Sequence, residues 1–255
     1  MIDRSLITFI TAGDPSTKDT LRFLKAMDEY ADIIELGIPS TDPMADGPTI
    51  QKADHRALKR GFKLDDVFQI VREFRKDSST PIVLMTYYNV IYVNGINRFI
   101  TEASKSGVNG IINVDLPIDE ADEYLSVCSE NQIKPIFLVA PNTETERLKK
   151  IDEASGFVYL VSTLGTTGAR NDISDTTFET LDRVKSICKK PVAVGFGVSK
   201  PDHVKGLTEA GADGVVVGSS IVDLIEKYED QAVDKIGRKV KTLKEPLFDV
   251  TSFNQ

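Results

Sequence analysis

The chain has 255 residues, 41% hydrophobic and 27% charged, which is ordinary for a globular protein with one sizeable core. Its net charge of −8 at pH 7 argues against non-specific nucleic-acid binding, so backbone N–H groups would have to hold any phosphate ligand. No apolar run is long enough for a signal peptide or a membrane span, so we expect a cytoplasmic protein with no nucleic-acid or membrane partner.

Short β-branched apolar runs recur along the chain, with helical patterns between them. Several runs lack alternation, as expected for parallel strands covered on both faces. This repetition predicts a (β/α)8 barrel, the TIM barrel, as a single domain over residues 1–255. A doubly wound sheet is the alternative, but repetition without a break in composition favours closure. The runs span residues 6–13, 32–39, 81–87, 110–117, 135–141, 156–163, 191–197 and 214–220.

Two helices are predicted with their ends: Asp119 fits as the N-cap of one and Ser174 as the N-cap of the other. These helices contain the two cysteines, Cys128 and Cys188, which we expect to be buried thiols. With two histidines and no His/Cys cluster in the chain, we expect no metal site.

The second run carries an acid, Glu35, where a strand should bury apolar side chains. If Glu35 faces the barrel interior, desolvation raises its pKa, and it can act as a general acid and then as a base. Pairing with a lysine or arginine is the alternative. Asp46 follows in a loop rich in proline and glycine, and Gly47-Pro48 resembles a helix start. Asp46 is functional if it points back toward Glu35, and otherwise it is a turn former or helix cap.

Glycines mark the ends of the last predicted strands. Residues 195–197 (GFG) and 217–220 (VGSS) lie where barrels usually bind phosphate, and 166–168 (TTG) could close a third side. Their alternative role is to make tight turns. Asp115 ends the fourth strand and is either a site residue or a support for a neighbouring loop. No predicted strand carries a lysine, which argues against Schiff-base chemistry. The candidate residues are acids, glycines that could bind phosphate, and apolar and aromatic side chains. They suit proton transfer on a phosphorylated, partly apolar substrate without a cofactor.

The stretch ELGIPSTDPMADGPTIQ (35–51) closely resembles the signature of the tryptophan synthase α subunit family. Further blocks follow in the family's order, over nearly the whole chain. The resemblance implies a TIM barrel and a lyase that cleaves indole-3-glycerol phosphate into indole and glyceraldehyde 3-phosphate. It also implies an α2β2 complex in which the β subunit carries PLP, while this subunit needs no cofactor. The blocks are residues 9–15, 84–89, 114–117, 158–168, 194–199 and 217–220.

The resemblance also assigns roles. Glu35 matches the acid that protonates the indole ring, Asp46 the carboxylate that accepts the indole N–H, and Tyr159 a secondary active-site tyrosine. The matches to the substrate pocket are Phe9, Tyr87 and Phe196 at the indole, Gly168, Gly197, Gly218 and Ser219 at the phosphate, and Thr167 in the closing strand-six loop. The matches to the β-subunit interface are Pro39, Asp42, Asn89 and Pro117.

The chain departs from the family pattern at two places. Ser40-Thr41 replaces the common Phe-Ser pair, which puts loop packing and partner contact in question, and the helix that many members place before strand one is absent. One alternative is another phosphate-binding barrel, but an indole-glycerol-phosphate synthase would need a catalytic lysine on a strand and a pentose-phosphate epimerase would need histidine metal ligands, and neither is present. The other alternative is a catalytically weak subunit that mainly activates its partner; the Glu35/Asp46 pair argues against it, and the altered pair at 40–41 keeps it open.

Overall fold

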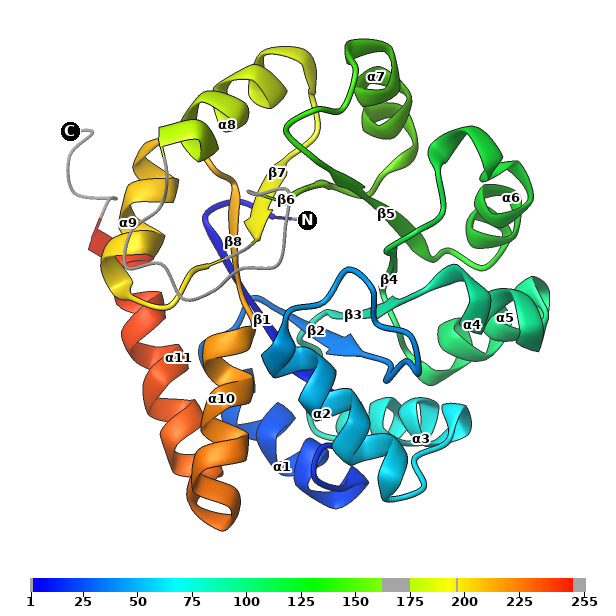
Figure 1. The fold of residues 1–255 in the computed structure, drawn as a ribbon, viewed down its shortest axis with the longest axis vertical. Coiled ribbons are helices and arrows are strands. Elements are labelled where there is room, and N and C mark those ends of the chain that lie inside the picture. The colour runs from blue at the N-terminus through cyan, green and yellow to red at the C-terminus, as the bar shows by residue number, and fades with distance from the viewer. Residues whose placement is uncertain (1, 162–174, 196, 250–255) are drawn as a thin grey trace.

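The computed structural model describes residues 2–161, 175–195 and 197–249. Eight parallel strands pair in chain order and close into a barrel, and helices surround it (Figure 1). The TIM-barrel prediction is therefore confirmed. The strands are β1 (Ser5–Thr11), β2 (Ile33–Gly37), β3 (Ile82–Thr86), β4 (Gly110–Asn113), β5 (Lys134–Val139), β6 (Val158–Val161), β7 (Val192–Gly195) and β8 (Gly214–Val217).

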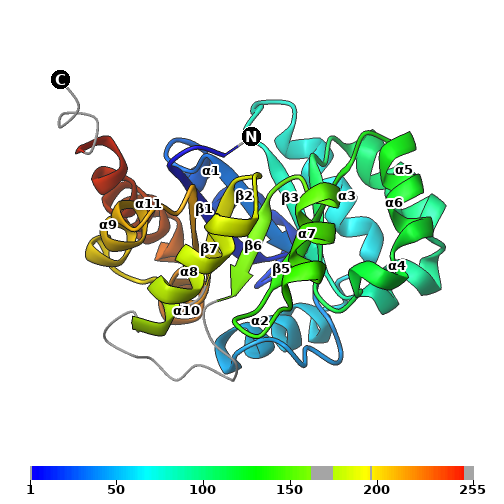
Figure 2. The same cartoon turned by 90° about the horizontal axis from the view of Figure 1, so that it is seen from above.

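Helices follow the strands on the outside, and Figure 2 shows them from above. They are α1 (Thr17–Asp28), α2 (Pro48–Lys59), α3 (Leu64–Phe74), α4 (Tyr88–Asn94), α5 (Ile96–Ser106), α6 (Asp122–Glu130), α7 (Thr145–Ala154), α8 (Asp175–Ile187), α9 (Pro201–Glu209), α10 (Ser219–Tyr228) and α11 (Ala232–Asp249), with 3-10 turns at Ile118–Glu120 and Glu229–Gln231. None of these described helices is long and apolar enough to cross a membrane.

The core has two parts because side chains alternate along each strand. In β2, Ile34 and Leu36 belong to the large cluster under the helices, and Ile33 belongs to the smaller cluster inside the barrel. Glu35 and Gly37 lie two and four residues after Ile33, on the same face of the strand, and so face inward. The strand register therefore decides which side chains reach the barrel interior.

An apolar side chain near the start of the described residues packs inside the barrel. Residues 2–4 are not helical, and β1 begins at Ser5. Ile2 is 5% exposed and packs in the interior cluster with Phe157. These apolar side chains therefore help to fill the interior of the barrel.

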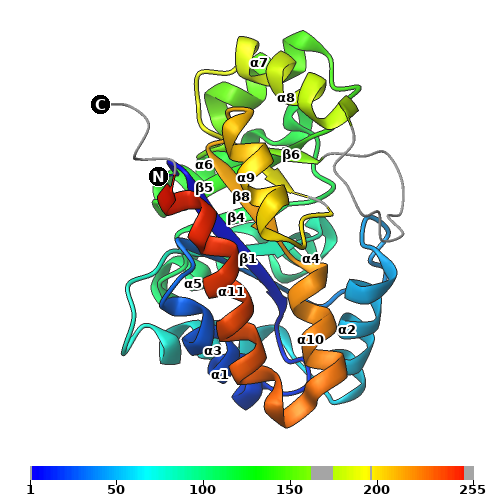
Figure 3. The ribbon, with the colours of Figure 1, turned by 90° about the vertical axis from the view of Figure 1, so that its left-hand side faces the viewer.

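The helix that follows Asp46 is tied to two neighbours. α2 begins at Pro48 with Gly47 as its N-cap, as predicted. Thr49 donates a hydrogen bond to Asp223 of α10 (3.0 Å), and Figure 3 shows the two helices side by side. Arg56 donates two hydrogen bonds to the buried Asp14, of 2.8 and 2.7 Å. α2 thus has a fixed position beside the barrel mouth.

Two local predictions are wrong. Asp119 does not cap a helix, because it lies in a 3-10 turn and α6 starts later, after Ala121. Its carboxylate instead accepts hydrogen bonds from Lys150 (2.5 Å) and Arg147 (3.1 Å) of α7. The prediction that no strand carries a lysine is also wrong, because β5 begins at Lys134, which is exposed. Ser174 lies outside the described residues, and both cysteines are buried free thiols, as expected.

Candidate active site

Glu35 lies in the middle of β2 with its side chain inside the barrel. It is fully buried, and it pairs in register with Phe9 of β1 and Val83 of β3. Neither carboxylate oxygen has a hydrogen-bond partner among the described residues, and no cation pairs with it there. Burial without a partner disfavours the charged form and raises the pKa of Glu35 to about 8. Near neutrality Glu35 is therefore mostly protonated and can donate a proton.

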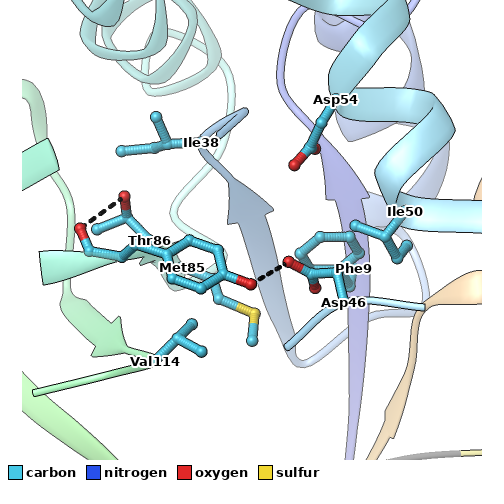
Figure 4. Close-up of a pocket in the computed structure, with 9 residues that line it drawn as sticks. Phe9, Ile38, Asp46, Ile50, Asp54, Met85, Thr86 and Val114 are labelled. Carbon is cyan, nitrogen blue, oxygen red and sulfur yellow. Dashed lines mark hydrogen bonds between the residues drawn. The ribbon is translucent and has the colours of Figure 1, made fainter. Parts of the chain in front are cut away.

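Asp46 lies in the Asp46 loop, residues 38–47, between β2 and α2. The Tyr87 hydroxyl donates a 2.6 Å hydrogen bond to Asp46 Oδ2, which is the dashed line at Asp46 in Figure 4. The same hydroxyl accepts a 3.0 Å bond from the Ala45 amide. Gln51 donates to the backbone oxygen of Asp46 at 2.8 Å. Burial raises the pKa of Asp46, and the Tyr87 hydrogen bond opposes that rise. The loop is thus held with the Asp46 carboxylate beside an aromatic hydroxyl.

A small hollow lies beside Asp46, and Figure 4 shows residues that line it; Glu35 is not among them. Apolar and aromatic side chains form most of its wall, and the carboxyl groups of Asp46 and Asp54 are its acidic part. This composition suits a flat apolar ring with one polar N–H. The lining residues are Phe9, Ile38, Asp46, Ile50, Asp54, Met85, Thr86, Tyr87 and Val114.

Two glycines leave the space that aromatic side chains fill. A Cβ at Gly195 would lie 2.4 Å from the Tyr159 hydroxyl oxygen, and a Cβ at Gly37 would lie 2.6 Å from the Phe9 ring. Tyr159 is buried, and its pKa is raised well above its usual range by burial and then by the charges of Glu35 and Asp46. Tyr159 therefore lies close enough to both acids to respond to them.

The ends of β7 and β8 offer backbone N–H groups to an anion. The two strands are paired, so Gly197 and Gly218, which follow them, lie at neighbouring strand ends. Gly197 has φ +70°, a conformation that favours glycine. Gly218 is the N-cap of α10, so the Ser219 amide in the first turn has no intrahelical acceptor. These N–H groups are therefore candidates for binding an anion.

Some predicted residues cannot be placed. Thr167, Gly168 and Phe196 lie outside the described residues. Asp115 is described, and its carboxylate accepts a 2.6 Å hydrogen bond from the Tyr88 amide at the start of α4. Asp115 thus supports a neighbouring segment, the second of its two predicted roles.

The predicted interface residues differ in exposure. Asp42, Asn89 and Pro117 are exposed, whereas Pro39 is buried in the free chain. Asp42 lies in the Asp46 loop, and Asn89 lies in α4, which begins directly after Tyr87. The hydrogen bonds of Tyr87 therefore connect two of the predicted interface segments to each other.

One acid of the pocket escaped the sequence analysis. Asp54 lies on α2, four residues after Ile50 and next to the buried Ala53, so it occupies the apolar face of the helix. An acid on the buried face of an amphipathic helix was the signal that could have revealed it. Among the described residues, no cluster of acids, histidines or cysteines has an arrangement that could hold a metal ion.

A closed parallel barrel with a buried acid on β2 and glycines after its last two strands places the chain in the class of TIM-barrel enzymes. Comparison with known proteins then identifies the family. The model of the tryptophan synthase alpha chain family matches residues 2–249. The chain belongs to this family, which consists of lyases of tryptophan biosynthesis.

Relatives and solved structures agree over nearly the whole chain. The tryptophan synthase alpha chain of Pyrococcus abyssi is 58% identical, over 94% of this chain and 98% of the relative. That of Thermococcus kodakarensis is 55% identical, over 94% and 95%. A chain in a structure of the tryptophan synthase α2β2 complex of Pyrococcus furiosus superimposes with a TM-score of 0.91 and 56% identity, over 95% of this chain and 98% of that chain.

Proposed function

We propose that the chain cleaves indole-3-glycerol phosphate into indole and glyceraldehyde 3-phosphate, with Glu35 and Asp46 as its catalytic acids. The observation that carries the proposal is Glu35, a fully buried carboxyl on a rigid strand without a hydrogen-bond partner among the described residues. Such a group is costly for stability, and a protonated acid at this place is what carbon protonation requires.

The reaction needs two proton transfers, and Glu35 takes part in both. Glu35 donates its proton to C3 of the indole ring, which leaves positive charge on the ring, and Asp46 stabilises that charge by accepting a hydrogen bond from the ring N–H. The glycerol hydroxyl then gives up its proton to the Glu35 carboxylate as the bond between C3 and the glycerol carbon breaks. The hydroxyl carbon becomes the aldehyde, indole leaves, and Glu35 is protonated again.

The remaining site residues position the substrate. Phe9 and Tyr87 line the apolar pocket, and Tyr159 lies near both acids. We propose that the amides at Gly197, Gly218 and Ser219 bind the phosphate, because they are the N–H groups at the ends of β7 and β8. Thr167, Gly168 and Phe196 are proposed to complete the site from the family resemblance alone.

We further propose that the chain forms an α2β2 complex with a tryptophan synthase β subunit, which carries PLP and receives indole. The Pyrococcus furiosus structure is described as showing mutual activation within such a complex. Large apolar side chains are exposed near the predicted interface residues: Met44 (88%) in the Asp46 loop, and Tyr92 (66%) and Val93 (68%) on α4. Exposed apolar groups of this size favour a protein partner. We place the complex in the cytoplasm and treat residues 1–255 as one domain.

The test is cleavage of indole-3-glycerol phosphate by the purified chain, with and without its β subunit. We expect slow cleavage alone and a large acceleration in the complex. Glu35→Gln and Asp46→Asn should each abolish cleavage in both conditions while the chain stays folded by circular dichroism. Turnover by either variant at the native rate would contradict the assigned role, and a folded native chain without activity in the complex would reject the proposed reaction.

A further inference from the structure

A third carboxyl group, that of Asp54, lines the hollow together with Asp46. Asp54 of α2 is 5% exposed, and it lines the same hollow as Asp46 and Tyr87 (Figure 4). The proposed reaction gives this group no direct part, since neither proton transfer nor the ring N–H requires a third acid. A buried carboxyl is nevertheless costly, so its contacts should show what it does.

The hydrogen bonds of Asp54 hold the beginning of the Asp46 loop. Its Oδ2 accepts a 3.2 Å bond from the backbone N–H of Ser40, and its Oδ1 accepts a longer 3.4 Å bond from the Thr11 hydroxyl at the end of β1. The Ser40 hydroxyl in turn accepts a 3.1 Å bond from the Asp42 amide. Ser40 thus links Asp54 to the segment that leads to Asp46.

The charges around Asp54 are mostly negative. Asp46 and the Tyr87 hydroxyl face it from the Asp46 loop and the end of β3, and Asp14 faces it from the loop after β1. Arg56, two residues on in α2, donates to Asp14, and no lysine or arginine in the described residues pairs with Asp54. Burial first, and then the charges of Asp46 and Asp14, raise the pKa of Asp54 to about 7 against its two hydrogen bonds.

We propose that Asp54 is a positioning residue for Asp46, which fixes the start of the Asp46 loop through the Ser40 amide. The inference rests on the proposed cleavage reaction and deepens it. An ionised carboxylate binds an N–H group about twice as strongly as a neutral one. The hydrogen bond from the Ser40 amide to Asp54, which we call the anchor, should therefore strengthen as the pH rises through 7. The fraction of molecules in which Asp46 is placed for catalysis should rise with it.

The test compares wild type with Asp54→Asn between pH 6 and pH 8. Asparagine keeps the shape and an acceptor oxygen, but it cannot ionise. We expect equal kcat values at pH 6, a wild-type kcat about fivefold higher at pH 8, and an unchanged KM, since the proposed phosphate site lies at α10. Asp65→Asn, which removes an exposed acid of α3, should match wild type throughout.

Amide hydrogen exchange at Ser40 gives a readout that does not depend on activity. The quantity compared is the protection of the Ser40 amide from exchange in wild type, divided by its protection in Asp54→Asn at the same pH. This ratio should grow about fivefold from pH 6 to pH 8, as the ratio of the kcat values does. A kcat ratio that stays constant with pH, or equal protection of Ser40 in both proteins, would overturn the inference. Inactive wild type with pH-dependent protection of Ser40 would instead reject the cleavage reaction and keep the anchor.

Discussion

Replacing Glu35 by glutamine should remove the loss of stability that Glu35 causes as the pH rises, and it should remove activity as well. The pKa of Glu35 is about 8 in the folded chain, against an ordinary value of 4.5. The unfolded state therefore binds fewer protons than the folded state between these values, and Glu35 lowers stability as the pH rises across that window. The linkage relation puts the cost at roughly 1 kcal/mol at pH 5 and roughly 3 kcal/mol at pH 7.

Glutamine has no such dependence, because its amide is neutral at every pH. The stability of Glu35→Gln relative to wild type should increase by about 2 kcal/mol from pH 5 to pH 7. The burial cost of the amide does not change with pH and cancels in that comparison. Activity should fall by about 10²–10⁴, the usual contribution of a general acid or base.

The measurement is urea unfolding of wild type and Glu35→Gln at pH 5 and pH 7, followed by one optical probe. Glu153→Gln, at an exposed position on α7, is the matched control and should show no relative change between the two pH values. If the difference between Glu35→Gln and wild type is the same at both pH values, Glu35 ionises normally in the folded chain. The argument for Glu35 as a proton donor would then lose its basis.

Three further predictions follow from single contacts. Gly195→Ala places a methyl group 2.4 Å from the Tyr159 hydroxyl oxygen. It should lower the free energy of unfolding by about 1–3 kcal/mol, measured by thermal unfolding, and it should lower kcat. Native values of both quantities would show that Tyr159 can move freely. Arg56→Ala leaves the fully buried Asp14 carboxylate unpaired. It should lower the free energy of unfolding by about 3–5 kcal/mol and so lower the melting temperature. An unchanged melting temperature would mean that Asp14 finds another partner. Ser219→Asp puts a negative charge at the start of α10, where we propose that the phosphate binds. Repulsion should raise KM for the phosphorylated substrate at least about tenfold. An unchanged KM would place the phosphate elsewhere.

The periodicity of the sequence could predict the barrel and the place of Glu35. Strand alternation puts Glu35 on the same face as Ile33, and a closed barrel makes that face the interior, so burial and a raised pKa follow. The strand ends were less predictable: the run 32–39 gives a strand that stops at Gly37. Strand length depends on where pairing with neighbours ends, which composition does not encode.

Tertiary contacts could not be predicted from local patterns. The Tyr87–Asp46 hydrogen bond joins residues 41 positions apart, and the ion pairs of Asp119 reach 28 and 31 positions along the chain. Asp119 looked like a cap because its local sequence permits one, but two cations on α7 compete for its carboxylate. Asp54 was overlooked because its importance depends on Ser40 and Thr11, which lie on other elements.

The two proposed catalytic acids are held in different ways, and this difference fits the role proposed for each. Glu35 is fixed by strand pairing on both sides, to Phe9 and to Val83, so its position and its raised pKa are properties of the barrel. Asp46 is held by side-chain hydrogen bonds from Tyr87 and Gln51, which can exchange without disturbing the core. A proton donor to carbon must be rigid and dry, whereas a carboxylate that meets the ring N–H can adjust when the substrate arrives. Control by a partner should therefore act on the Asp46 loop and leave the Glu35 strand unchanged.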